Sequence, residues 1–261
     1  MEPLTIILLI ISGLGAGIVT GLVGASAAVA VTPILVTFLN YPAFTAIGIS
    51  LATDIFASST SAKNYYTYGH LDIKNGITLT ILAVIGAFIG SALSNFIPDS
   101  MLGRGAGIAI LIIGINFLRK PMNKRIKEFK DRYKFNFVKK HKLLSTIIFG
   151  LLIGLICGMV GAGGGIMILM ILTFVLGYEI KTAIGTSVLI MTFIALSGAI
   201  GHFIHTGVPY VEILIAGISS IIGAAVASRF ANKASEDKLS KVIGVTFIVM
   251  AIVMIAKRFL N

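Results

Sequence analysis

The sequence predicts an all-α polytopic membrane protein built from two inverted repeats of five hydrophobic segments each. Of the 261 residues, 57% are hydrophobic and only 12% are charged, and the mean hydropathy is +1.01. This leaves too few charges to cover a soluble globular surface. The apolar residues fall into ten runs, and the second half of the chain superimposes on the first without a gap when Thr182 is placed on Thr45. These three observations together predict the fold class.

The ten predicted segments differ in length. Most contain close to the ~20 residues that a helix needs to span the hydrocarbon core of a bilayer. Segments 26–39 and 162–176 would extend only ~20 Å at 1.5 Å per residue, so we expect short discontinuous or re-entrant helices there. No basic region of the kind that opens a cleaved signal peptide precedes 4–23, which we therefore take as the first membrane segment. In chain order the segments are expected at about 4–23, 26–39, 44–66, 75–97, 101–118, 143–160, 162–176, 181–204, 209–229 and 239–256.

An internal repeat divides the chain into residues 1–118 and 143–261. In the register that places Thr182 on Thr45, the whole Thr-Ala-Ile-Gly block at 45–48 falls on an identical block at 182–185. The glycine-rich stretch before each block coincides as well. Each copy holds five segments, and an odd number of crossings places the two copies in opposite orientations. The repeat is therefore expected to be inverted.

The positive charge of the chain is concentrated in residues 119–142. This loop holds eleven Lys or Arg against Glu128 and Asp131, so +9 of the formal net charge of +11 lies there. Such a charge could bind nucleic acid, but its position between two apolar blocks favours a loop on the cytoplasmic face of a membrane. We expect a multi-pass plasma-membrane protein with this loop in the cytoplasm and both termini outside.

The two short segments begin at matching glycine-rich stretches. Non-helical backbone is tolerated at membrane depth only against protein or a watery cavity. A helix that starts there presents free N–H groups and the positive end of its dipole, so two such ends could bind an anion without a buried lysine. The alternative is that small residues serve only close helix packing, as the spacing of Gly17 and Gly21 indicates for those two. The candidate substrate-binding residues in these stretches are Gly24, Ala25, Ser26, Gly161, Gly163, Gly164 and Gly165.

The block at 158–165, the following Thr-Ala-Ile-Gly-Thr-Ser at 182–187, and their counterparts at 21–28 and 45–50 carry a family resemblance. The sequence resembles the TauE/SafE family of membrane permeases over essentially the whole chain. In the first repeat, Ser-Ala-Ala stands at 26–28 where the family usually has a glycine triplet. The resemblance implies export or uptake of sulfite, sulfonates or related sulfur anions.

Polar residues within membrane segments are candidates for function, because burying them is costly. Asp54 is the only acidic residue deep in a predicted segment. Its carboxyl group could couple transport to protons, or it could simply accept hydrogen bonds from nearby hydroxyls. Four hydroxyls in matching segments could bind anion oxygens or bond back to their own helix. They belong to Ser50, Thr53, Thr186 and Ser187.

Lys63 and His202 end the third and eighth segments and are further candidates for coupling or gating. Lys63 could attract an anion from the cytoplasm, or it could mark the lipid interface. His202 and His205 could share a helix face, but the glutamate of the metalloprotease spacing is absent, so we expect no metal. An interfacial aromatic belt is expected at three tyrosines, Tyr65, Tyr66 and Tyr68.

Taken together, these patterns predict a secondary transporter of a small anion that works by alternating access. No phosphate-binding Gly-Lys-Ser/Thr motif is present, so we expect neither ATP hydrolysis nor a cofactor. A channel or uptake permease for the same anions, a membrane-embedded enzyme and a partner subunit stay open as alternatives. The expected partners are the anion, with or without protons, and the lipid bilayer, and a homo-oligomer stays open. Cys157, the single cysteine, is expected to be buried and inert.

Overall fold

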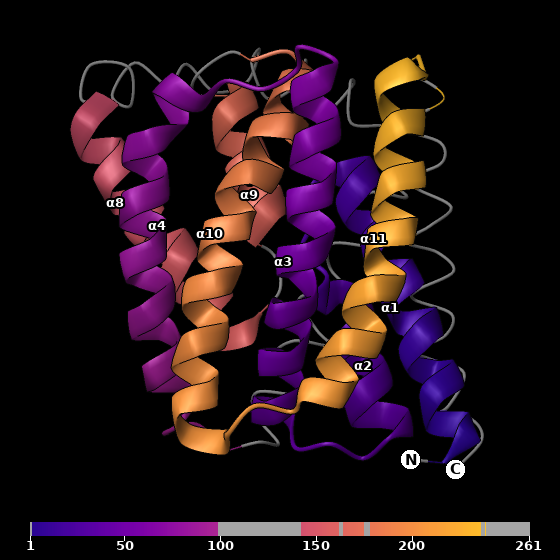
Figure 1. The fold of residues 1–261 in the computed structure, drawn as a ribbon. Coiled ribbons are helices and arrows are strands. Elements are labelled where there is room, and N and C mark those ends of the chain that lie inside the picture. Colours follow the sequence, from indigo (N-terminus) through magenta and orange to yellow (C-terminus); the bar gives the residue numbers. More distant parts are fainter. Residues whose placement is uncertain (1, 99–141, 162–163, 175–177, 236–237, 239–261) are drawn as a thin grey trace.

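The computed structural model is a bundle of helices that run up and down along one common direction (Figure 1). It describes residues 2–98, 142–161, 164–174, 178–235 and 238. These residues form helices and the links between them, and none of them lies in a strand. The helices are α1 (Pro3–Val23), α2 (Ala28–Phe38), α3 (Ala43–Thr67), α4 (Ile73–Ser94), α8 (Lys142–Val160), α9 (Gly164–Phe174), α10 (Ile180–Thr206) and α11 (Tyr210–Lys233).

Each predicted segment that falls on described residues is confirmed as a helix. The two segments expected to be short are α2 and α9, with 11 residues each. The predicted segments 101–118 and 239–256 lie outside the described residues, as does the basic loop up to residue 141.

The outer surface of the bundle is apolar. Large side chains such as Ile81 (57%), Ile222 (57%) and Val226 (67%) are exposed. In water, so much exposed apolar surface would drive aggregation, whereas lipid solvates it. Within the described part of the chain, α1, α3, α10 and α11 are long and apolar enough to cross a membrane. The chain is therefore a membrane protein.

Among the described helices, two pairs are packed most closely, α1 with α11 and α4 with α8. A Cβ added at Gly17 of α1 would lie 2.1 Å from the Ser220 carbonyl oxygen of α11. One added at Gly154 of α8 would lie 2.0 Å from the Ala83 carbonyl oxygen of α4. Only glycine allows backbones to approach so closely. The packing role predicted for Gly17 is confirmed. Each pair joins the first helix of one repeat to the fourth helix of the other.

Both α1 and α8 end at a glycine in the left-handed conformation. Gly24 has φ 70° and donates its N–H to the Thr20 carbonyl oxygen at 2.9 Å. Gly161 has φ 72° and donates to the Cys157 carbonyl oxygen at 2.7 Å. A side chain at this backbone geometry is strained, so glycine ends the helix cleanly. The chain continues without helical structure from Gly24 through Ser26 before α2 begins.

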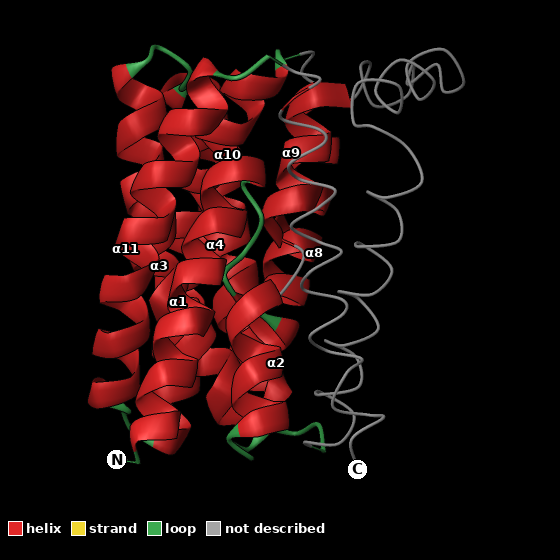
Figure 2. Ribbon diagram, turned by 90° about the vertical axis from the view of Figure 1, so that its right-hand side faces the viewer, coloured by secondary structure: helices red, strands yellow, loops and turns green. Residues whose placement is uncertain are grey.

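The short helices lie toward opposite ends of the bundle. Figure 2 shows α2 in its lower part, at the end where the N-terminus lies, and α9 in its upper part. The breaks that precede them therefore fall between the two ends, at the depth where a bilayer would have its interior.

Candidate functional site

The two breaks contact each other in the centre of the protein. Ser26 Oγ donates a hydrogen bond of 2.7 Å to the carbonyl oxygen of Gly161. A Cβ added at Gly165 would lie 1.9 Å from the carbonyl oxygen of Gly24. The two predicted half-sites are thus brought together, and they touch through backbone atoms. We call this contact region, Gly24–Ser26 with Gly161, Gly164 and Gly165, the central break.

The start of α2 points its N–H groups into the central break. Ala28 N–H donates to Ser26 Oγ at 3.3 Å, while residue 27 at the N-cap is an alanine and has no side chain to cap the helix. The positive end of the α2 dipole therefore lies beside the broken backbone. Ala25 is buried there, with 1% of its surface exposed. Gly163, the remaining predicted residue of the second half-site, lies outside the described residues.

Asp54 of α3 lies beside the central break and is fully buried. Its polar neighbours are the hydroxyls of Thr20 and Ser26 and the N–H of Ala27. None of them reaches hydrogen-bond geometry with the carboxylate, and within the described part of the chain neither Asp54 oxygen has a partner. The Thr20 hydroxyl is also buried without a partner. Burying a charge in this way is costly. Binding of a proton or a ligand to this cluster would therefore be strongly favourable.

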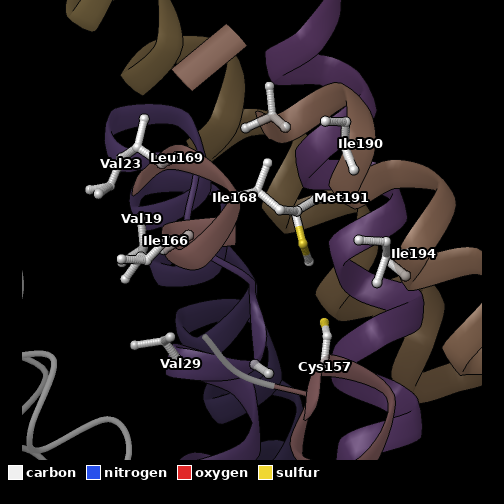
Figure 3. Close-up of a cluster of buried hydrophobic side chains, with 14 of the residues drawn as sticks. Val19, Val23, Val29, Cys157, Ile166, Ile168, Leu169, Ile190, Met191 and Ile194 are labelled. Atoms are coloured by element: carbon white, nitrogen blue, oxygen red, sulfur yellow. The ribbon is translucent and has the colours of Figure 1, made fainter. Parts of the chain in front are cut away.

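An apolar cluster surrounds the second half of the central break. Figure 3 shows Cys157 and Met191 pointing their sulfur atoms toward each other, with Ile168, Ile190 and Ile194 around them. A Cβ added at Gly164 would lie 2.8 Å from Cys157 Sγ and 3.3 Å from Met191 Sδ. Cys157 is buried as expected. The glycine at 164 lets the start of α9 pack against this cluster.

Comparison with known proteins identifies the family of this chain. The family model described as sulfite exporter TauE/SafE matches residues 9–254. The chain belongs to the TauE/SafE family. Among its curated relatives, the probable membrane transporter protein YdhB of Bacillus subtilis is 29% identical over 231 residues, covering 88% of this chain and 92% of the relative. YunE of the same organism, also named a probable membrane transporter protein, is 25% identical over 249 residues, covering 88% and 91%. A probable membrane transporter protein of Xylella fastidiosa (strain 9a5c) is 26% identical over 264 residues, covering 96% and 95%.

No solved structure matches the chain. The family assignment and the names of the relatives establish a membrane transporter of the TauE/SafE family, as the resemblance of the glycine-rich blocks predicted. Relatives named as transporters also favour a protein that is not an enzyme.

Three of the four predicted hydroxyls in this TauE/SafE protein bond back to their own helix. Ser50 Oγ is 2.7 Å from the Ala46 carbonyl oxygen and also 2.7 Å from Thr32 Oγ1 of α2. Thr53 Oγ1 donates to the Ile49 carbonyl oxygen at 2.9 Å, and Ser187 Oγ to that of Ile184 at 2.8 Å. This is the alternative role considered for these hydroxyls. Ser187 nevertheless lies at the central break, because a Cβ added at Gly24 would come within 2.4 Å of its Oγ.

Thr186 lies apart from the central break. Its Oγ1 accepts the N–H of Asp72 at 3.0 Å, at the link between α3 and α4. It also lines a cavity of about 560 Å³ between α4 and α10 whose walls are mostly apolar, with Ile77, Ile81 and Phe193 among the lining residues. Such a cavity offers little to an anion.

Lys63 is exposed near the end of α3, away from the central break. His202 is buried and donates through Nε2 to the carbonyl oxygen of Gly158 at 2.9 Å. Its ring packs against Phe44, with centroids 4.3 Å apart. His202 thus supports the helix end that leads into the second half of the break.

The aromatic-belt prediction is wrong for Tyr65. Tyr66 is exposed (66%) and Tyr68 is exposed (39%), but Tyr65 is fully buried. Its hydroxyl donates to the carbonyl oxygen of Gly21 at 3.0 Å. In the register of the internal repeat, Tyr65 falls on His202 and Gly21 on Gly158. The repeat register could therefore have identified Tyr65 as the first-repeat counterpart of His202.

Proposed function

We propose that this TauE/SafE protein is a secondary transporter of a small anion, either sulfite, an organosulfonate or a related sulfur oxyanion, and that it works by alternating access. The observation that carries the proposal is the central break, where two glycine-ended helices meet at the start of α2 beside the buried Asp54. The family description as a sulfite exporter supports the substrate class.

Backbone N–H groups would supply the attraction for the anion. Among the described buried residues there is no lysine or arginine, and the charged or ionisable polar ones are Asp54 and His202. The N-terminus of a helix can bind an anion through its free N–H groups and its dipole. Glycine at positions 164 and 165 lets backbone, rather than side chains, line the region.

Asp54 would couple transport to protons. Its carboxylate lies next to the N–H groups that the substrate would use, and two negative charges repel strongly in a medium of low dielectric constant. Protonation of Asp54 removes this repulsion. The anion and a proton would therefore enter the site together.

The remaining candidates would act around this site. Lys63, exposed at the end of α3, would attract anions to that end of the protein, and His202 would keep the second half of the break in place. The two repeats, in opposite orientations, would supply the two packings that alternating access requires. The matching left-handed glycines at 24 and 161 support this arrangement.

Purified protein in liposomes, with labelled sulfite, sulfate, thiosulfate and taurine, tests the proposal. We expect saturable uptake of a sulfur oxyanion that an imposed pH gradient drives against its concentration gradient. Flux that does not saturate and cannot be driven uphill would favour the channel instead. A chemically altered substrate would favour an enzyme.

A further inference from the structure

Two tyrosine–carboxylate hydrogen bonds join the two halves of the molecule. Tyr41 donates its hydroxyl to Glu212 Oε1 at 2.7 Å, and Tyr178 donates to Asp72 Oδ2 at 2.7 Å. Tyr41 and Tyr178 fall on each other in the register of the internal repeat. Each carboxylate stands at the start of the fourth helix of a repeat, Asp72 directly before α4 and Glu212 in the first turn of α11.

The backbone around the two tyrosines is also equivalent. Tyr41 N–H donates to the Leu35 carbonyl oxygen at 3.1 Å, and Tyr178 N–H to that of Leu172 at 3.0 Å. Leu35 and Leu172 coincide in the same repeat register. Each tyrosine is thus fixed at the end of a short helix, α2 or α9, whose other end borders the central break.

The two bonds lie at opposite ends of the bundle. Figure 1 shows α3 and α11 beginning at the lower end, where Tyr41 meets Glu212, and α4 and α10 beginning at the upper end, where Tyr178 meets Asp72. In both cases the tyrosine belongs to one repeat and the carboxylate to the other. Each bond therefore ties the two repeats together at one face of the membrane.

We propose that these two bonds are the paired gates of the transport cycle, so that each face opens only when its own tyrosine–carboxylate bond breaks while the other bond stays formed. The proposal rests on the alternating-access function proposed above. With both bonds formed, the structure corresponds to a closed state in which neither face gives access to the central break.

The chemistry of the bonds suits such a gate. A hydrogen bond to a charged acceptor is stronger than a neutral one, yet in these half-buried positions water can replace either partner once the face opens. Burial and the neighbouring Glu212 raise the pKa of Tyr41 to about 12, so the phenol keeps its proton and stays a donor at neutral pH. The phenol thus keeps its proton up to pH ~10, the pKa of an unperturbed tyrosine, and the bond is lost as the pH rises toward 12.

Side-specific labelling tests the gates. In a Cys157→Ser background, a Ser26→Cys reporter at the central break is exposed to a membrane-impermeant thiol reagent from one side of the membrane at a time. We expect Tyr41→Phe to raise the labelling rate about tenfold, and only from the face that holds the α2–α3 link. Tyr178→Phe should do the same only from the opposite face. Tyr66→Phe removes the hydroxyl of an exposed tyrosine and is the matched control, with labelling unchanged.

Glu212→Gln and Asp72→Asn give a second pair of variants that keep an acceptor but lose its charge, and we expect smaller increases from the same faces. Labelling equal to that of Tyr66→Phe in all four variants, or raised from the wrong face, overturns the proposal. The assay needs no substrate, so it tests the gates independently of the proposed substrate. Side-specific labelling without anion flux would support the gates and contradict the proposed substrate.

Discussion

Asp54 presents the clearest chemical problem at the scale of single residues. It is fully buried, its oxygens have no hydrogen-bond partner within the described part of the chain, and its neighbours Thr20 and Ser26 offer only hydroxyls. A permanently charged carboxylate in this position would be destabilising. A carboxyl group that gains and loses a proton during each cycle would explain how such a residue is tolerated beside the central break.

The first prediction concerns proton coupling. Asp54→Asn keeps the shape of the side chain but cannot titrate, so we expect anion flux to become independent of the pH gradient. Uptake into liposomes over pH 5 to 8, with a labelled sulfonate whose own charge is constant over this range, measures the effect. Glu179→Gln, which removes an exposed carboxylate before α10, is the control and should keep the response. A pH response unchanged in Asp54→Asn would rule out the proposed role.

The second prediction concerns the contact between the breaks. A methyl group at Gly165 would lie 1.9 Å from the carbonyl oxygen of Gly24, a backbone atom that cannot rotate away. We expect Gly165→Ala to lower flux at least tenfold, and Gly164→Leu to abolish it, while membrane insertion persists. Gly76→Ala on α4 is the control, because its nearest neighbour is a side-chain methyl group of Thr186 at 3.3 Å. Wild-type flux in Gly165→Ala would show that the breaks need not touch.

At the scale of helices, stability depends on backbones that approach closely. Lipid solvates apolar side chains about as well as the protein interior does, so helix association in a membrane relies on packing rather than on the hydrophobic effect. The glycines of α1 and α8 supply that packing against α11 and α4. The matching positions of these glycines in both repeats indicate a common structural requirement.

The third prediction tests this packing. A methyl group at Gly17 would lie 2.1 Å from the Ser220 carbonyl oxygen, so Gly17→Ala must push α1 away from α11. We expect a loss of at least about 2 kcal/mol of stability, although alanine is the better helix former. Thermal unfolding in detergent, followed by gel filtration of the remaining folded protein, measures it. Ile18→Ala, at the next and exposed position of α1, should unfold close to the wild-type temperature.

At the scale of the whole molecule, the arrangement of the helices implies an orientation in the membrane. Residue 2 lies at the same end as the start of α3, and the end of α3 lies at the opposite end with the start of α10 (Figure 1). The basic residues of 119–142 favour the cytoplasm for the loop they form. The last residue of this loop, Lys142, begins α8 at the same end as the end of α3, so we infer that the end with residue 2 faces outward.

The fourth prediction follows from this orientation. In a Cys157→Ser background, we expect Glu2→Cys to react with an impermeant thiol reagent in intact cells and Thr67→Cys to react only in inverted vesicles. Both positions are exposed. The parent without cysteine should not react in either preparation. Reaction of both reporters from the same side would contradict the inferred orientation.

The helices and the two breaks could be predicted from the sequence, because apolar runs and glycines act locally. Gly24 and Gly161 stand where the runs were expected to end, and both helices do end there. The local pattern carries no information on which distant segments touch, so the contact of α1 with α11 could not be predicted. For the same reason the bond between Tyr41 and Glu212 was missed, whereas the burial of Tyr65 was missed although the repeat register pairs it with His202.

The pairing of α1 with α11 also has a consequence for how the protein is made. α1 is synthesised well before its partner α11, which begins only at Tyr210. Until then the glycine face of α1, with Gly13, Gly17 and Gly21, has no backbone to pack against. We expect a nascent chain that ends before α11 to remain open to other helices and to quality-control proteases. Maturation of the first repeat is thus delayed until α11 of the second repeat has entered the membrane.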